Sequence, residues 1–400
     1  MSQLPLAGLK ILDCASFIAA PFAATTMAEF GAEVLKVEPP GVGDSMRRLG
    51  TPAVEGADSF FWLSEARNKR SITLDLRTPE GVGLFKRLVR GADVVCENFR
   101  PETMEKWGLG YDALKRENPG IILFQVSAFG QQGPYRDRPG FARIAHAFGG
   151  LCYLTGMPGG PPLTPGSTSL ADYICGLYGA FAIMTALRHR EATGEGQKID
   201  IALYEPIFRV LDELAPAYQK FGVVRDRQGL HTAVACPHGH FECADGQWVA
   251  LACSNDKMFA RLAAAMDQPE LAEPTRFGAV AERMKNHDKI NELVAAWFHG
   301  LTRKEALARA VDHEVPCAPI NSIRDLFEDQ QIAARGTITE VARDDIGALA
   351  VPNVVPRLSQ TPGAVTSLGP HLGEANDEIY GQRLGLSRAE QVVLRKKGVI

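Results

Sequence analysis

Short runs of β-branched and aliphatic residues alternate with amphipathic stretches over the first half of the chain. This alternation is typical of a parallel sheet, because parallel neighbours need a crossover connection, usually a helix. The expected strands are Leu9–Cys14, Glu33–Glu38, Ser71–Leu76, Asp93–Glu97, Ile121–Ser127 and Lys198–Leu203. The expected helices are Pro21–Phe30, Pro79–Arg90, a pair that ends at Glu117, and Tyr173–Arg190. The pattern therefore predicts an α/β fold with a doubly wound, Rossmann-like domain.

A second unit is expected after a change in composition near Phe221–Arg227. The segment Phe241–Ala252 carries Asp245-Gly246 at its centre, which favours a β-hairpin. Helical patterns follow over Phe259–Ala265, Met284–Phe298 and Lys304–His313, and the chain ends in an expected helix, Arg388–Lys397. The sequence thus indicates a smaller α+β domain after the first.

Two common nucleotide-binding fingerprints are absent. The stretch after the first strand, Ala15–Pro21, contains no GxGxxG turn, so a nicotinamide or flavin dinucleotide site is not expected. No GxxxxGK[ST] loop occurs either, which argues against an NTPase. The 43 basic and 47 acidic residues give a net charge of −4, so neither nucleic acid nor an anionic membrane is expected as a partner.

Location is inferred from three further features. The N-terminus lacks the charged and apolar regions of a secretory signal. The most apolar segment, Tyr173–Leu187, is about fifteen residues, whereas a membrane span takes about twenty. The eight cysteines are scattered without paired spacing, which is typical of reduced thiols. We therefore expect a cytoplasmic protein.

Asp172 stands where a loop rich in Gly and Pro, between Gly149 and Gly166, meets the apolar helix. On position alone, we expect it to be the N-cap of that helix, with the helix dipole and free amides keeping its carboxylate ionised. A purely structural cap and a functional carboxylate both remain open at this point.

A cluster of four potential zinc ligands, Cys236, His238, His240 and Cys243, falls within eight residues. Its spacing is not a usual structural zinc pattern, and the segment runs into a strand whose alternate residues face opposite sides. No metal site is expected. His238 and His240 are left with two alternatives, a place in an active-site cleft or a packing role.

Several blocks in order along the chain resemble the class III, or CaiB/BaiF-type, CoA-transferase family. The blocks are Gly8–Asp13, Gly31–Pro40 with Gly43, Asp44 and Arg47, Asn68–Asp75, Glu97–Pro101, Asp172–Gly176 with Thr193–Gln197 and Asp200, Val315–Pro319 and Gly369–Gly373. The resemblance implies a large Rossmann-like domain built from residues 1–215 and 321–400, a small inserted domain at 225–320, and two identical chains interlocked like linked rings.

The resemblance also implies a reaction. Asp172 lies where the family places its nucleophilic aspartate, so it is expected to form a mixed anhydride and then an aspartyl-CoA thioester with an acyl-CoA donor. A CoA thioester is thus a substrate, and no tightly bound cofactor is expected. Backbone amides of Gly166, Ser167 and Ser169 are candidate donors to the developing oxyanion. The residues expected to bind CoA are Lys69, Arg70, Leu74, Arg77, Asn98, Phe99, Arg100 and Lys106.

Two positions differ from branches of the family, and the differences make those branches' reactions less expected here. Ile18 stands where the formyl-CoA branch has a glutamine, and Phe141 stands where the racemase branch has its acid/base histidine. Arg143 follows, a natural bidentate partner for a second carboxylate, which favours a dicarboxylic substrate, although a structural ion pair is an equal alternative. We expect a CoA-transferase with succinyl-CoA as the first donor to test; the alternatives are an acyl-CoA racemase or epimerase and a non-catalytic CoA-binding protein.

Overall fold

The computed structural model describes residues 4–400 and divides them into two compact units. Unit 1 combines residues 4–151, Gly166–Asp212 and Gln330–Ile400, and unit 2 combines Cys152–Pro165 and Glu213–Asp329. Each unit is described by itself below. The domain boundaries expected at residues 215, 225 and 320 stay a prediction.

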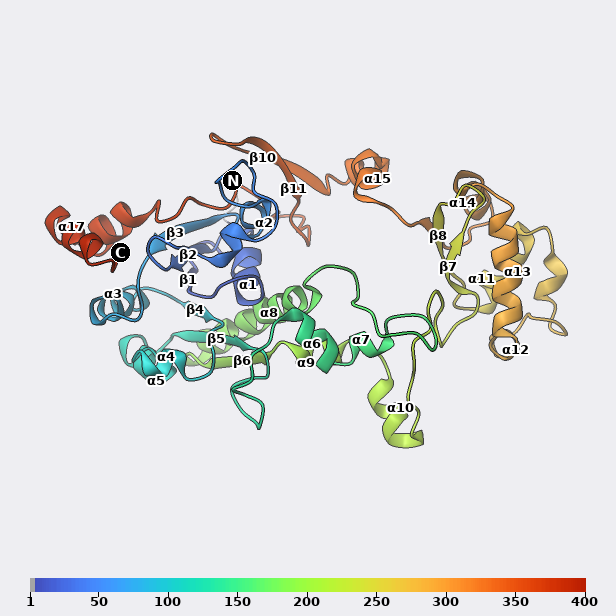
Figure 1. Ribbon diagram of the computed structural model, residues 1–400, viewed down its shortest axis with the longest axis horizontal. Helices are drawn as coiled ribbons and strands as arrows, with labels where there is room; N and C mark the ends of the chain where they lie inside the picture. The colour runs from blue at the N-terminus through green and yellow to red at the C-terminus, as the bar shows by residue number, and fades with distance from the viewer. Residues whose placement is uncertain (1–3) are drawn as a thin grey trace. The chain divides into compact units, whose positions relative to one another are not determined.

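Unit 1 is built on a six-stranded sheet in the order β3-β2-β1-β4-β5-β6, and all five strand pairs are parallel. The strands, which can be followed in Figure 1, are β1 Lys10–Asp13, β2 Glu33–Glu38, β3 Lys69–Thr73, β4 Val94–Glu97, β5 Ile122–Ser127 and β6 Lys198–Ala202. A mixed α/β fold with a parallel sheet is therefore confirmed. The expected limits of the third strand were wrong, because the ladder with β2 already begins at Lys69, opposite Val34.

The connections of unit 1 are mainly helical. Its helices are α1 Ala19–Ala28, η1 Ser45–Arg48, α2 Phe60–Glu65, α3 Pro79–Val89, α4 Thr103–Lys106, α5 Tyr111–Glu117, α6 Ala142–Phe148, α8 Leu170–Thr193, α9 Tyr204–Arg209, α16 Gln330–Ala334, η3 Asp377–Arg383 and α17 Arg388–Lys396. The four-residue helix α7, Leu151–Leu154, lies at the boundary between the units. A two-stranded hairpin of β10 Ile338–Arg343 and β11 Gly347–Pro352 completes unit 1.

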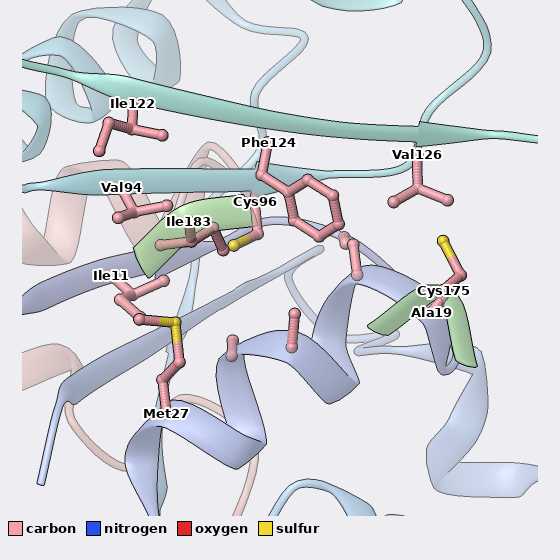
Figure 2. Packing of buried hydrophobic residues seen from close by; sticks show 14 of the residues in the cluster. Ile11, Ala19, Met27, Val94, Cys96, Ile122, Phe124, Val126, Cys175 and Ile183 are labelled. Atoms are coloured by element: carbon pink, nitrogen blue, oxygen red, sulfur yellow. The ribbon is translucent and has the colours of Figure 1, made fainter. Parts of the chain in front are cut away.

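Successive residues of the strands face two different cores. Ile11 points into a cluster that includes α1 and α8, and its neighbour Leu12 points into a cluster with α3 and the C-terminal residues Val399 and Ile400. Figure 2 shows the first cluster, with Val94, Cys96 and Phe124 pointing from the strands towards α1 and α8. The alternation arises because side chains in a strand point to opposite faces. Both faces of the sheet are therefore covered.

Two glycines let α8 lie close to its neighbours. A Cβ atom at Gly179 would come within 2.3 Å of Phe124 Cζ, and one at Gly176 within 2.8 Å of the Ala19 carbonyl oxygen. Neither position accommodates a larger residue without displacement of the helix. The small residues of α8 thus set the depth at which the helix, and with it Asp172, lies over the sheet.

The helix α8 is longer than expected. It covers 24 residues, so the expectation that its apolar segment is too short to cross a membrane was wrong as an argument from length. Its buried residues Ala171, Cys175 and Ile183 pack in the first core cluster of unit 1, as Figure 2 shows for Cys175 and Ile183. One face of α8 therefore packs into the core of unit 1.

Unit 2 contains a three-stranded antiparallel sheet in the order β7-β8-β9, formed by β7 His238–Glu242, β8 Trp248–Ala252 and β9 Cys317–Pro319. Its helices are α10 Leu214–Phe221, α11 Asp256–Ala265, η2 Pro269–Ala272, α12 Val280–Lys285, α13 His287–His299, α14 Arg303–Asp312 and α15 Ile323–Glu328. The hairpin predicted from Asp245-Gly246 is present as β7 and β8.

The single helix expected over Met284–Phe298 was wrong. The chain leaves helical geometry at Asn286, where φ is −114° and ψ is 33°, and so forms α12 and α13. All eight cysteines lie in the described part of the chain and are free, as their scattered spacing predicts.

Candidate active site

The carboxyl ends of β1 and β4 mark the point where the strand order of the sheet reverses. In open parallel sheets, ligands bind in the crevice at this point. Here the two following loops are joined by Asn98, whose Oδ1 accepts a hydrogen bond from the Ser16 amide at 2.8 Å and whose Nδ2 donates to the Ser16 carbonyl at 2.6 Å. The side chain of Asn98, which was predicted to contact CoA, therefore joins the two loops that border the crevice.

A cavity of about 420 Å³ opens at the ends of β1 to β4. Three of the residues expected to bind CoA, Leu74, Arg77 and Phe99, line it. Leu74 is almost completely buried, whereas Arg77 is exposed and forms a bidentate ion pair with Asp75 at 2.8 and 2.9 Å. The cavity thus combines apolar walls with an exposed guanidinium, as a nucleotide that carries phosphates requires.

Sequence reasoning missed other residues of this cavity, including Ser16, Val42 and Trp107. Trp107 packs edge to face on Phe99 with a centroid distance of 5.0 Å. Glu97, whose pKa burial raises to about 7, accepts a hydrogen bond from the Phe99 amide at 2.7 Å and so orients the same loop. The position of Ser16 just beyond the first predicted strand was the available signal.

Four basic residues of the expected CoA set do not line this cavity. Arg70 pairs with Glu378, Lys106 lies 4.0 Å from Glu102, and Arg100 is exposed beyond β4. Lys69 is 3 % exposed, and its Nζ donates to Asp13 Oδ2 and to the Pro21 carbonyl, both at 2.8 Å. We correct the expectation for Lys69, because a buried ammonium held by these two acceptors is not available to a phosphate.

Lys69 belongs to a buried ion network beneath the loop after β1. Lys36 lies 2.8 Å from Asp44 Oδ2, and its Nζ also donates to the Ala15 carbonyl. Burial by itself lowers the pKa of Lys36, but the carboxylates of Asp13 and Asp44 outweigh it and raise this pKa above its ordinary value. Asp44 Oδ1 accepts the amide of Phe17, a bulky residue held at a φ of 61°. The network therefore fixes a strained loop that borders the cavity.

The same loop reaches α6. Phe17 packs edge to face on Phe141 with a centroid distance of 5.7 Å, and Phe141 is the residue that precedes α6. Arg143, in the first turn of α6, is exposed and has no ion-pair partner within residues 4–400. A structural ion pair, the alternative interpretation of Arg143, is therefore not found.

The helix α8 begins before Asp172. Its first residue is Leu170 and its N-cap is Ser169, so the expectation that Asp172 is the N-cap was wrong. Asp172 is instead the third residue of the helix, with its amide donating to the Ser169 carbonyl at 2.9 Å. None of the described residues donates a hydrogen bond to its carboxylate, which is partly buried.

The ionisation of Asp172 also differs from the expectation. Burial raises the pKa of its carboxyl to about 7, because the charged form is removed from water without a partner. We had expected the helix dipole and the free amides to keep the carboxylate ionised. Desolvation outweighs them here. A partly buried carboxylate whose pKa lies near neutrality is a candidate for chemistry.

The segment just before α8 offers backbone donors. Gly166 has a φ of 64°, and Gly166 and Ser167 are exposed. No hydrogen bond among the described residues uses the amides of Ser167 or Ser169. The predicted oxyanion donors therefore have free N–H groups, although their role stays a prediction.

Unit 2 has a cavity of its own, of about 590 Å³. His240 lines it together with His231 and Asn291, while His238 is partly buried. The alternatives for His238 and His240 stay open.

Comparison with known proteins agrees with the family suggested by the sequence blocks. The model of CoA-transferase family III matches residues 6–376. The beta subunit of succinyl-CoA–L-malate CoA-transferase from Chloroflexus aurantiacus is 54 % identical, covering 100 % of this chain and 99 % of that protein. The alpha subunit from the same organism is 51 % identical, covering 100 % of this chain and 93 % of that protein.

A solved structure has the same fold. A CaiB/BaiF family protein from Brucella suis superposes with a TM-score of 0.83 at 34 % identity, covering 95 % of this chain and 100 % of that one.

Proposed function

The chain belongs to CoA-transferase family III, and from this premise we propose that it moves CoA from succinyl-CoA to a small dicarboxylic acid, with Asp172 as nucleophile. L-Malate is the first acceptor to test, because two relatives more than half identical to this chain carry succinyl-CoA and L-malate in their names. The CoA thioester is a substrate of the enzyme.

The observation that carries the proposal is the Asp172 carboxylate itself. It lies in the first turn of α8, partly buried and without a hydrogen-bond donor in the described chain, and burial raises its pKa to about 7. A carboxylate that is neither paired nor fully solvated is a stronger nucleophile than one stabilised by donors. Loss of water also protects an anhydride from hydrolysis.

In the first half of the proposed reaction, the Asp172 carboxylate attacks the thioester carbonyl of succinyl-CoA. The C–S bond breaks, CoA leaves as a thiolate, and a mixed succinyl-aspartyl anhydride remains. The thiolate then attacks the aspartyl carbonyl of the anhydride, which releases succinate and leaves an aspartyl-CoA thioester. Free amides at Ser167 and Ser169 are the proposed donors to the oxyanion at each step.

The second half reverses these steps with the acceptor. A carboxylate of the incoming acid attacks the carbonyl of the aspartyl thioester, the C–S bond breaks, and the CoA thiolate leaves as a second mixed anhydride forms. The thiolate then attacks the acyl carbonyl derived from the acceptor, which forms the product thioester and restores the Asp172 carboxylate. No proton is consumed, so the nucleophile only has to be ionised at the outset.

CoA is proposed to bind in the cavity at the ends of β1 to β4. Leu74 and Phe99 supply apolar contact, Arg77 supplies positive charge, and Asn98 holds the loop after β1. We leave Lys69 out of this set, and Arg70, Arg100 and Lys106 are basic residues that do not line the cavity.

Replacing Arg77 by Glu tests this cavity. We expect the KM for succinyl-CoA to rise roughly 10- to 100-fold with kcat nearly unchanged, because a charge-assisted hydrogen bond contributes about 1.5–3 kcal/mol. Arg90→Glu is the matched control, since Arg90 is also exposed and also paired with a carboxylate, Glu117, but does not line the cavity. Steady-state kinetics check both variants, and equal effects would argue against the assignment.

The pKa of Asp172 gives a pH prediction. Only the ionised carboxylate attacks the thioester, so kcat/KM is expected to rise about tenfold per pH unit below about pH 7 and to level off above it. A profile of kcat/KM between about pH 5.5 and 8.5, with an acyl-CoA that is stable over this range, measures the rise and the plateau. A flat profile over this range would show that Asp172 does not titrate near neutrality.

Assembly is also proposed, as an interlocked pair of chains. Leu177, Tyr178, Phe181 and Met184 of α8 are 38–70 % exposed, which is unusual for a run of large apolar residues in one helix. Since relatives are named as alpha and beta subunits, the second chain is either a copy of this one or a similar subunit. Light scattering on the purified chain is expected to give about twice the mass of one chain, 43.4 kDa. A measured mass equal to that of one chain would exclude a pair of identical chains and leave a similar subunit as the partner.

We further propose that the enzyme acts in the cytoplasm on dissolved acyl-CoA. The eight free cysteines and the core packing of α8 support this placement.

The proposed function is tested by incubating the protein with succinyl-CoA and L-malate and separating the CoA thioesters by chromatography. If CoA is transferred, the amount of malyl-CoA formed is expected to equal the amount of succinyl-CoA consumed. A parallel reaction in deuterated water measures exchange at the α-carbon. Exchange without transfer would support the racemase alternative, and binding of succinyl-CoA without either reaction would support a non-catalytic CoA-binding protein.

A further inference from the structure

One hydrogen bond connects α6 to the first turn of α8. Nε2 of His146, on α6, accepts the backbone N–H of Ala171 at 2.8 Å, and Ala171 immediately precedes Asp172. Both ends of this bond are buried, with His146 1 % exposed and Ala171 fully covered. The bond therefore operates away from solvent, where hydrogen bonds are strongest.

The start of α8 has no cap from its own sequence. The Ser169 side chain makes no cap hydrogen bond, and its φ of −83° and ψ of 54° differ from the extended geometry usual at an N-cap. An acidic residue at the third helical position commonly reaches back to the N-cap amide, but the Asp172 carboxylate makes no such bond. The imidazole of His146 accepts the Ala171 amide hydrogen, which the side chain of an N-cap residue commonly accepts.

The bond fixes the state of the imidazole. Because Nε2 accepts, it carries no proton, and the neutral ring therefore has its proton on Nδ1. Burial lowers the pKa of His146, and the charge of Arg143 lowers it further. Nδ1 is buried and has no hydrogen-bond partner in the described part of the chain. Nothing else on the ring competes with its bond to Ala171.

We propose that His146 is a positioning residue, which holds the first turn of α8 so that the Asp172 carboxylate stays free and aimed at the thioester. The inference rests on the proposed function of Asp172. It follows from the geometry: the imidazole from α6 takes the Ala171 amide in place of a local cap and so fixes the first turn of α8, on which Asp172 stands. His146 touches the backbone beside the nucleophile and not the substrate.

The test compares two substitutions. His146→Leu keeps an apolar volume but removes the acceptor, whereas His146→Gln keeps an oxygen that reaches the Ala171 amide. We expect kcat of the Leu variant to fall roughly 10²-fold with the KM for succinyl-CoA nearly unchanged, because small misplacements of a reacting group cost about this much. The Gln variant is expected to recover most of the loss. His189→Gln, at an exposed position on α8, is the control.

The hydroxylamine-sensitive adduct on Asp172 separates failure of this inference from failure of the function. If the wild-type protein forms no adduct, the function itself is wrong. If the wild-type and Leu proteins form the adduct at equal rates, the role of His146 is overturned while the function stands. A Gln variant as slow as the Leu variant overturns the role as well.

A measurement on the unmodified protein covers the case in which His146→Leu does not fold. Selective ¹⁵N-histidine labelling is expected to show His146 as the neutral ring protonated at Nδ1, at about pH 7.5. An imidazolium, or a ring protonated at Nε2, would contradict the inference.

Discussion

Replacing Asp172 by Asn lowers transfer from succinyl-CoA by at least roughly 10⁴-fold, because the covalent route loses its nucleophile. Asp172→Ala gives the same loss and excludes slow deamidation of Asn as a source of residual rate. Glu191→Gln removes a carboxylate from the exposed end of the same helix and is expected to leave the rate unchanged. Initial rates of malyl thioester formation measure all three.

The same Asn variant is expected to be more stable than the wild-type protein above neutral pH. In the folded state the pKa of Asp172 is raised to about 7, above its value in the unfolded chain, so the folded protein favours the protonated carboxyl. This contribution is fully present at low pH and is lost as pH rises through about 7. Asp172→Asn should therefore raise Tm by about 2 °C at pH 8.5 and change it little at pH 4. A lower Tm at pH 8.5 would show that the loss of rate is a folding defect.

Replacing Arg143 by Gln is the second change with a large expected effect. Arg143 is exposed, has no ion-pair partner within residues 4–400, and stands one helical turn before His146, which contacts the residue beside Asp172. A guanidinium there is proposed to hold the carboxylate of the acceptor that does not react. We expect kcat/KM for L-malate to fall roughly 10²-fold, the value of one or two charge-assisted hydrogen bonds.

Selectivity distinguishes this role from a general defect. With 2-hydroxybutyrate, which lacks the second carboxylate, Arg143→Gln is expected to react at the wild-type rate, so the preference for the dicarboxylate nearly disappears. Arg188→Gln, at an exposed position far along α8, controls for loss of one positive charge. An equal fall with both acids would remove Arg143 from substrate recognition.

The sheet of unit 1 could be predicted because its strands are apolar on both faces. Leu12 and Ile11 point to different cores, and this near-continuous apolar character is what a parallel sheet requires. The limits of β3 could not be predicted, since Lys69 and Arg70 were expected to bind CoA and are in fact within the strand. The pairing with β2, the ion pair with Asp13 and the bond to the Pro21 carbonyl hold Lys69 inside.

The candidate site was predicted in part. Leu74, Arg77 and Phe99 meet at one cavity because the residues that follow parallel strands share one edge of the sheet. The prediction for Asp172 as an N-cap was wrong: the helix begins at Leu170, and the amide of Ala171 is bound by a side chain of α6. His146 left no signal at all, since its partner is a backbone amide 25 residues away.

Mass spectrometry of the protein after incubation with succinyl-CoA, trapped with hydroxylamine and digested, tests the central claim most directly. The account predicts a hydroxamate on Asp172 of the wild-type protein and none at any residue of Asp172→Ala. An adduct on another residue, or transfer to L-malate without any adduct, would contradict Asp172 as the nucleophile.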